Sequence, residues 1–114
     1  MLDIQYTELA LRTLSQKDTD VVGHMIVGLS TEAGELLDNY KKHRFYGRDL
    51  DIRNIKEEIG DLYWYLAILC RQVGYSLDQA KIDNIEKLAK RYPDEFVDVI
   101  YRDVDMELEH IKKD

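Results

Sequence analysis

The 114-residue sequence is poor in the residues that interrupt helices: it contains one proline and six glycines. Proteins built from sheets and turns use both residues more often. Alanine, leucine, glutamate, lysine and glutamine, which favour helices, are plentiful instead. This composition predicts an all-α fold, and the length and the 45% hydrophobic content suit a single domain spanning residues 1–114.

Three other features are scarce, and each scarcity excludes a class of protein. Cys70 is the only cysteine, so an internal disulfide is excluded, and its apolar neighbours predict a buried, unreactive thiol in a reducing compartment. No leader-like segment opens the chain and no apolar run approaches the about 18 residues of a membrane span, which predicts a cytoplasmic protein without a membrane partner. The formal charge of −7, with no local basic patch, argues against binding a nucleic-acid polymer.

Apolar periodicity and capping residues predict four helices, over about residues 3–14, 20–42, 51–73 and 76–92. The two long helices carry apolar residues at alternating steps of three and four, a spacing that keeps one stripe facing a partner helix. The stripes are Val22, Ile26, Leu29, Ala33, Leu36 and Tyr40 in one helix and Ile52, Ile55, Ile59, Leu62, Leu66, Leu69 and Val73 in the other. We therefore expect a four-helix bundle whose two central helices are the long ones.

The ends of these helices are predicted from local signals. Asp51 or a neighbour caps the third helix, Gly74 ends it, and Ser76 with Gln79 forms a capping box for the fourth. Pro93 ends the fourth helix, after which a C-terminal extension follows. Within it, residues 96–101 are interpreted as a short extended piece or a helical turn, and residues 106–112 as a last helix.

The two long helices share an acidic signature at a constant offset of 26 residues. Glu32-Ala33-Gly34-Glu35-Leu36 corresponds to Glu58-Ile59-Gly60-Asp61-Leu62, and the apolar stripes correspond at the same offset. Residues three apart share a helix face, so each helix carries a carboxylate pair beside its apolar stripe. Antiparallel packing of the two stripes would bring both pairs into one cluster of four carboxylates.

Such a cluster requires protons or cations, because each like-charge pair at about 4 Å costs on the order of 4 kcal/mol at an effective dielectric near 20. Mg²⁺ suits it, since this ion prefers oxygen ligands and commonly bridges carboxylates and phosphates. A glycine inside a helix costs roughly 1 kcal/mol, so Gly34 and Gly60 indicate a compensating reason such as close backbone approach. The alternative is that these acids are solvated and paired with lysines, which the matched duplication disfavours.

The fourth helix carries a polar stripe of Asn84, Lys87 and Arg91 at steps of three and four. Arginine forms forked bonds to phosphate oxygens, lysine offers a compact charge, and asparagine can recognise a sugar or a base. The stripe is thus a candidate phosphate and nucleotide contact. Its alternative is an ordinary solvated helix face.

These residues together resemble the MazG-like nucleotide pyrophosphohydrolases of the all-α NTP pyrophosphatase superfamily. The resemblance covers roughly residues 20 to 103. It rests on the segments at 32–36, 57–66 and 84–93, and on a spacer of 22 residues between Glu35 and Glu58, which lies within the family's customary spread.

The resemblance implies an Mg²⁺-dependent enzyme, with Mn²⁺ as a possible substitute, that hydrolyses a nucleoside triphosphate to its monophosphate and pyrophosphate. It also implies a helical bundle that forms a homodimer or homotetramer. The implied metal ligands and catalytic residues are Glu32, Glu35, Glu58 and Asp61, and the implied substrate contacts are Asn84, Lys87 and Arg91. Thr31 departs from the family pattern, since many relatives have another acid there that is a candidate general base. The base and sugar of the substrate stay open, with non-canonical and deoxy nucleotides among the candidates.

Two other functions compete with this hypothesis. The apolar stripes alone would suit a non-enzymatic, dimerising helical interaction or regulatory protein, but a scaffold gains nothing from four carboxylates beside its core. A di-iron bundle uses a Glu-x-x-His element twice, whereas this sequence has one copy, formed by Glu107 and His110. Pyrophosphate release that depends on magnesium would separate the enzyme from the interaction protein, and a colorimetric iron assay would test the di-iron alternative.

Overall fold

The structure, a computed structural model, describes residues 1–97. Four α-helices form this part of the chain, namely α1 (Asp3–Leu11), α2 (Val21–Tyr46), α3 (Ile52–Gln72) and α4 (Leu77–Arg91), and a 3₁₀ helix η1 (Pro93–Phe96) follows. No strand occurs among residues 1–97. The predicted all-α fold, with two long helices that carry the acids, is therefore confirmed. The expectations for residues 98–101 and 106–112, and the Glu107–His110 pair, lie outside the described residues, and Phe96 belongs to η1.

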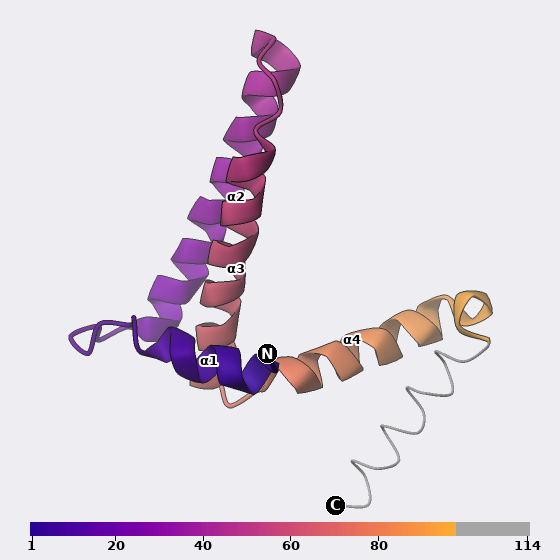
Figure 1. Cartoon of the computed structure of the whole chain (residues 1–114). Helices are drawn as coiled ribbons and strands as arrows, with labels where there is room; N and C mark the ends of the chain where they lie inside the picture. Colours follow the sequence, from indigo (N-terminus) through magenta and orange to yellow (C-terminus); the bar gives the residue numbers. More distant parts are fainter. Residues whose placement is uncertain (98–114) are drawn as a thin grey trace, which may run out of the picture. The chain divides into compact units, whose positions relative to one another are not determined.

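The chain divides into two compact units, Met1–Tyr75 and Ser76–Asp114, which are described separately. In the first unit, α2 and α3 lie side by side as a hairpin, and α1 packs across one end of it (Figure 1). Ala10, Met25 and Ile68 are the buried centre of this unit. The half-buried residues around them are Tyr6, Leu11, Leu14, Val21, Trp64, Tyr65 and Leu69.

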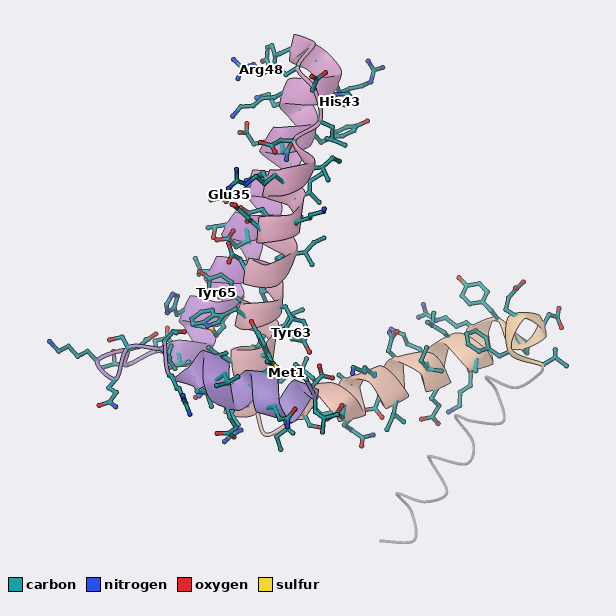
Figure 2. The ribbon with its side chains drawn as sticks, in the orientation of Figure 1. Met1, Glu35, His43, Arg48, Tyr63 and Tyr65 are labelled. Carbon is teal, nitrogen blue, oxygen red and sulfur yellow. The ribbon has the colours of Figure 1, made fainter. Side chains whose placement is uncertain are left out.

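Polar contacts also attach α1 to α3. The Tyr63 hydroxyl donates to the Asp3 carboxylate. Figure 2 shows Tyr63 near Met1, at the start of the chain. The Trp64 indole donates to the Thr13 hydroxyl at 2.9 Å, just beyond the end of α1. Because α1 is only nine residues long and would be marginal alone, these contacts and the shared core hold it in place.

Turn chemistry fixes the ends of α2 and α3. The Asp20 carboxylate accepts from the Gly23 N–H at 3.0 Å, and the Asp51 carboxylate accepts from the Asn54 N–H at 3.0 Å, as the sequence predicted for Asp51. The second helix continues beyond the predicted Lys42 to Tyr46, because the first left-handed residue is Gly47, with φ of 68°. Gly74, with φ of 69°, follows α3 as expected.

The first helix ends earlier than predicted, at Leu11 instead of Leu14. Residues 12–14 bond three residues back, and the Thr13 hydroxyl donates to the Ala10 carbonyl at 2.7 Å. Threonine side chains compete in this way with the α-helical ladder, which tightens and terminates it.

The apolar stripes are less buried within the chain than their spacing predicted. In α2 the fully buried residues are Met25, Gly28 and Asn39, whereas Ile26 and Tyr40 of the predicted stripe are each 52% exposed. In α3 the stripe alternates: Ile55, Leu62 and Leu69 are half-buried, and the exposed members are Ile52, Ile59, Leu66 and Val73. The two long helices pack against each other as predicted, but they meet along only one edge of each stripe, so the other stripe residues are exposed within residues 1–97.

The second unit is described by α4 and η1, which contact each other. The Ser76 hydroxyl accepts from the Gln79 N–H at 3.0 Å and caps α4 as predicted. The Gln79 side chain donates to Asp83 at 2.8 Å, so the other half of the predicted capping box is replaced by a bond within the helix. None of the described helices combines the length and apolar character that crossing a membrane requires.

Candidate metal centre

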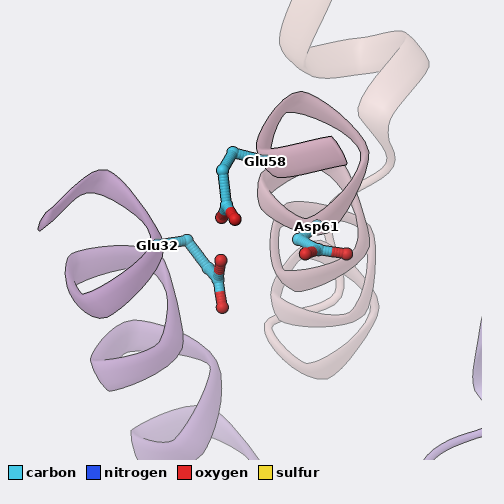
Figure 3. A group of neighbouring side chains, drawn as sticks. All are labelled: Glu32, Glu58 and Asp61. Carbon is cyan, nitrogen blue, oxygen red and sulfur yellow. The ribbon is translucent and has the colours of Figure 1, made fainter. Parts of the chain in front are cut away.

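The packing of α2 against α3 brings acids from both helices together. One carboxylate oxygen from each of Glu32, Glu58 and Asp61 lies within 4.8 Å of the other two (Figure 3). Glu32 comes from α2, and Glu58 and Asp61 lie one turn apart on α3. Three of the four predicted ligands therefore converge, as expected from two matched helices.

The fourth predicted ligand, Glu35, contacts this group through Glu58. A hydrogen bond with Glu58, followed by the negative charge of Glu58, raises the pKa of the Glu35 carboxyl. The pKa of Glu58 is raised in turn, first by a hydrogen bond with Glu32 and then by burial. Two carboxyls share a hydrogen bond only if one of them carries a proton, so in the metal-free chain Glu35 and Glu58 hold protons more tightly than free carboxyls do.

Burial makes this arrangement costly without a compensating cation. Glu58 is only 4% exposed. Its Oε2 atom and the Oε2 atom of Glu32 are buried and accept no hydrogen bond from any described residue. An ionised carboxylate in this state is strongly disfavoured unless it is paired or binds a metal. The all-oxygen donor set and the two unpartnered oxygens fit a hard divalent cation such as Mg²⁺.

Tyr65 packs beside this acid group. A Cβ atom on Gly28 would overlap the Tyr65 ring, so α2 needs a glycine at this position. Burial, followed by the charges of Glu32, Asp61 and Glu35, raises the pKa of the Tyr65 hydroxyl. Gly28 was not predicted from the sequence, although it precedes Glu32 by four residues and therefore shares the face of α2 that meets α3.

The close approach predicted at Gly34 and Gly60 does not occur within the first unit. A Cβ atom added to Gly34 or Gly60 would meet nothing within 4 Å among the described residues. Both glycines follow an inward-facing glutamate by two residues, which turns them about 200° around the helix axis and toward the outside. The close approach occurs at Gly28 instead, and it is made by the Tyr65 ring.

A polar groove of about 510 Å³ begins at Glu35 and was also missed by the sequence analysis. It extends along the last turns of α2 to the loop that joins α2 to α3, and Lys42 and Arg48 are its cations. The buried Asn39 amide at its base donates to the Asp51 carbonyl at 2.9 Å. The signal available in the sequence was the seven-residue step from Glu32 to Asn39, which places an amide on the same inward face.

The predicted substrate contacts lie in the second unit. Asn84, Lys87 and Arg91 are exposed residues of α4. Two neighbouring lysines are engaged within the helix, since Lys81 pairs with Asp78 at 3.7 Å and Lys90 with Glu86 at 3.0 Å. Lys87 and Arg91 form no ion pair with a described residue, which suits cations that bind a ligand. Their approach to the acids stays a prediction.

Comparison with known families gives one result. The family model described as MazG nucleotide pyrophosphohydrolase domain matches residues 23–108, which include all seven predicted site residues. The comparisons with curated proteins and with solved structures gave no match.

Proposed function

Because the chain belongs to the MazG nucleotide pyrophosphohydrolase family, we propose that it hydrolyses a nucleoside triphosphate to the monophosphate and pyrophosphate in an Mg²⁺-dependent reaction. The observation that carries this proposal is Glu58, a buried carboxylate whose Oε2 atom lacks a partner in the described structure and which lies among other acids. A scaffold would not need such a group, whereas a metal-dependent hydrolase would.

In this proposal Glu32, Glu58 and Asp61 hold the metal, and Glu35 completes the set from one turn along α2. Mg²⁺ held there would neutralise charge at the phosphates and would lower the pKa of a water that it binds. Water attacks the α-phosphorus, the bond from that phosphorus to the bridging oxygen breaks, and pyrophosphate leaves. Asn84, Lys87 and Arg91 bind the nucleotide and its phosphates from α4.

The residues of the chain hold the acids in place for this work. The close packing of Tyr65 on Gly28 fixes the separation of α2 and α3 beside the acids. Thr31, which stands where many relatives have an acid, donates its hydroxyl proton to the Gly28 carbonyl at 3.0 Å. Thr31 therefore serves the helix, and the water must lose its proton elsewhere in the site.

A screen of ribonucleoside and deoxyribonucleoside triphosphates for pyrophosphate release tests the proposal. We expect release from at least one triphosphate with Mg²⁺, reduced release or none after chelation, and a monophosphate as the other product. Release of orthophosphate, or no reaction with any triphosphate, would contradict the proposed activity and leave the helical interaction protein as the better hypothesis.

We also propose that the protein assembles as a homodimer or homotetramer. The residues that favour this are the exposed apolar members of the α3 stripe at 52, 59, 66 and 73, which repeat every seven residues, together with Ile26 and Tyr40 on α2. An apolar helix face of this length is costly in water and is commonly covered by a second copy. Assembly would suit the enzyme and the interaction protein equally, so it does not decide between them.

A further inference from the structure

The polar groove that begins at Glu35 is placed to receive a part of the substrate that the acids do not bind. Glu35 and Arg48 lie along the same edge of the hairpin, with Arg48 in the loop just beyond α2 and Glu35 further down α2 (Figure 2). Glu35 and Lys42 both line the groove and are seven residues apart, about 10 Å along the helix axis. This length is comparable with that of a nucleoside.

The wall of the groove is held by specific hydrogen bonds. Asn39 is 9% exposed, and its amide donates to the Asp51 carbonyl at 2.9 Å and to the Asn54 side-chain oxygen at 3.1 Å. The Asn39 oxygen accepts from the Asp51 N–H at 3.2 Å. On the other side of the loop, His43 Nδ1 lies 2.7 Å from the Arg48 carbonyl oxygen. The backbone on both sides of residues 49 and 50 is therefore anchored to α2.

Most charged side chains in the groove are already engaged. Lys42 pairs with Asp38 at 2.8 Å, and the Asp51 carboxylate caps α3. The Arg48 guanidinium and the Asp49 carboxylate form no hydrogen bond or ion pair with any side chain or backbone group of residues 1–97. The groove thus offers a ligand the planar donors of the Arg48 guanidinium and the acceptor oxygens of the Asp49 carboxylate.

The charge of the groove indicates which part of a nucleotide it receives. Its lining has four carboxylates, at residues 35, 38, 49 and 51, and two cations, so its formal charge is negative. A triphosphate chain would be repelled there, whereas a neutral group with both donors and acceptors would not. The side-chain NH2 group of Asn54, the Arg48 guanidinium and the Asp49 carboxylate match the hydroxyls and ring heteroatoms of a nucleoside.

We propose that this groove binds the nucleoside part of the substrate, with Arg48 donating to acceptors on the base and Asp49 accepting from a hydroxyl or amino group. The inference rests on the proposed function, because the phosphates are assigned to the acid site and to α4. It assigns base and sugar selectivity to the loop between α2 and α3.

The test uses the triphosphate that the wild-type chain hydrolyses best, with Mg²⁺-tripolyphosphate as a probe that has phosphates and no nucleoside. We expect Arg48→Ala and Asp49→Asn each to raise KM for the nucleotide by about tenfold or more, since both remove a charged hydrogen-bonding group. Neither should change the inhibition constant of tripolyphosphate. Arg44→Ala is the matched control, because Arg44 lies over Phe45 at 5.6 Å and does not line the groove.

Each alternative outcome is decisive. An unchanged KM in Arg48→Ala and Asp49→Asn would overturn the inference while leaving the proposed activity intact. Equal weakening of nucleotide and tripolyphosphate would show that the groove binds phosphates and would also overturn it. If the wild type hydrolyses no triphosphate, the proposed function fails and the inference fails with it.

Two further measurements support the kinetic test. Thermal midpoints that match the wild type exclude misfolding of the variants. A shift of the NMR signal of the Asn54 side-chain amide on addition of an α,β-methylene triphosphate provides a readout independent of turnover.

Discussion

The α2–α3 hairpin has two sides of opposite character, although both come from the same repeated sequence. Viewed down the axis of α3, Asp61 and Ile59 lie on opposite sides of Glu58. Asp61 belongs to the acid group, whereas Ile59 is 58% exposed. The acid side contains a buried carboxylate oxygen without a partner, and the apolar side continues through Leu66 and Val73. When the two repeated helices pack against each other, they therefore form a candidate catalytic side and a candidate assembly side at the same time.

We expect the acid side to determine chemistry and the apolar side to determine assembly. Substitutions on the acid side should change catalysis and metal binding while the metal-free fold tolerates them, because they relieve repulsion. Substitutions on the apolar side should change the oligomeric state first.

The largest effect is expected for Glu58→Gln, which keeps the shape of the side chain and removes its charge. Turnover should fall by about a hundredfold or more, because the charge acts on the metal and on the transition state together. Without Mg²⁺ the variant should be as stable as the wild type or more stable. Steady-state kinetics and thermal unfolding measure the two effects. Wild-type turnover at saturating Mg²⁺ would show that the acid group is not the site.

On the apolar side, Ile59→Glu should dissociate the assembly. A charge in the middle of the repeating apolar face must be buried without a partner in the oligomer. Light scattering at micromolar protein should give two or four chains for the wild type and fewer for Ile59→Glu. Arg53→Glu is the control, since Arg53 is exposed on α3 and lies outside the stripe. A wild type that is monomeric across this range would contradict the assembly proposal.

Metal and protons should compete for the acid side. The raised pKa values of Glu35 and Glu58 mean that the folded chain binds protons more tightly there than the unfolded chain. Their contribution to stability is therefore highest at low pH and falls as the pH rises above their ordinary value of 4.5. Saturating Mg²⁺ should add about 2.7 kcal/mol at a hundred times Kd.

Thermal unfolding with and without Mg²⁺, at about pH 5 and about pH 7.5, measures this competition. The stabilisation by Mg²⁺ should be larger at the higher pH, where the acids are ionised. Asp38, whose pKa is lowered by its hydrogen bond to Lys42, acts in the opposite direction, but only below its ordinary value of 3.8. A Mg²⁺ effect that is independent of pH would argue that the ion binds elsewhere.

Lys87→Ala tests whether α4 contributes to the acid side. A phosphate contact present in both ground and transition states should raise KM by about tenfold and change kcat little. Lys90→Ala is the matched control, because Lys90 is already paired with Glu86. Equal kinetics in the two variants would remove Lys87 from the site.

The smallest effect is expected for Gly34→Ala and Gly60→Ala, whose added methyl groups meet nothing among residues 1–97. Each should stabilise the chain by roughly 0.5–1 kcal/mol in chemical denaturation, because alanine favours helix over glycine. A loss of stability would indicate that another surface, such as a second copy, approaches these glycines.

Much of the site could be predicted from sequence because it depends on helical periodicity. The acids repeat on two matched helices, so their convergence required only that the helices pack against each other. The caps at Asp51 and Ser76 follow from the chemistry of these side chains, which can bond the first backbone N–H groups of a helix. The packing glycine and the groove could not be predicted in the same way. Gly28 is required by the position of the Tyr65 ring, and the groove by the path of the loop at Arg48, and both depend on contacts between distant residues.

The burial of the apolar stripe on α3 also could not be predicted from the sequence. A spacing of three and four indicates an apolar face without indicating whether it is covered by the same chain or by another. Ile55 and Ile59 carry the same signal in the sequence, yet one is half-buried and the other exposed. Which edge of a stripe meets the other helix depends on the rotation of each helix about its own axis, and the spacing of apolar residues does not specify that rotation.

The central claim is that the acid group at Glu58 binds a divalent cation. Direct titration with Mn²⁺, monitored by electron paramagnetic resonance, tests this claim without any substrate. The wild-type chain should bind Mn²⁺ in competition with Mg²⁺, and Glu58→Gln should bind it at least about tenfold more weakly, because a buried charged ligand is lost. Equal affinity and stoichiometry in the two proteins would contradict the account.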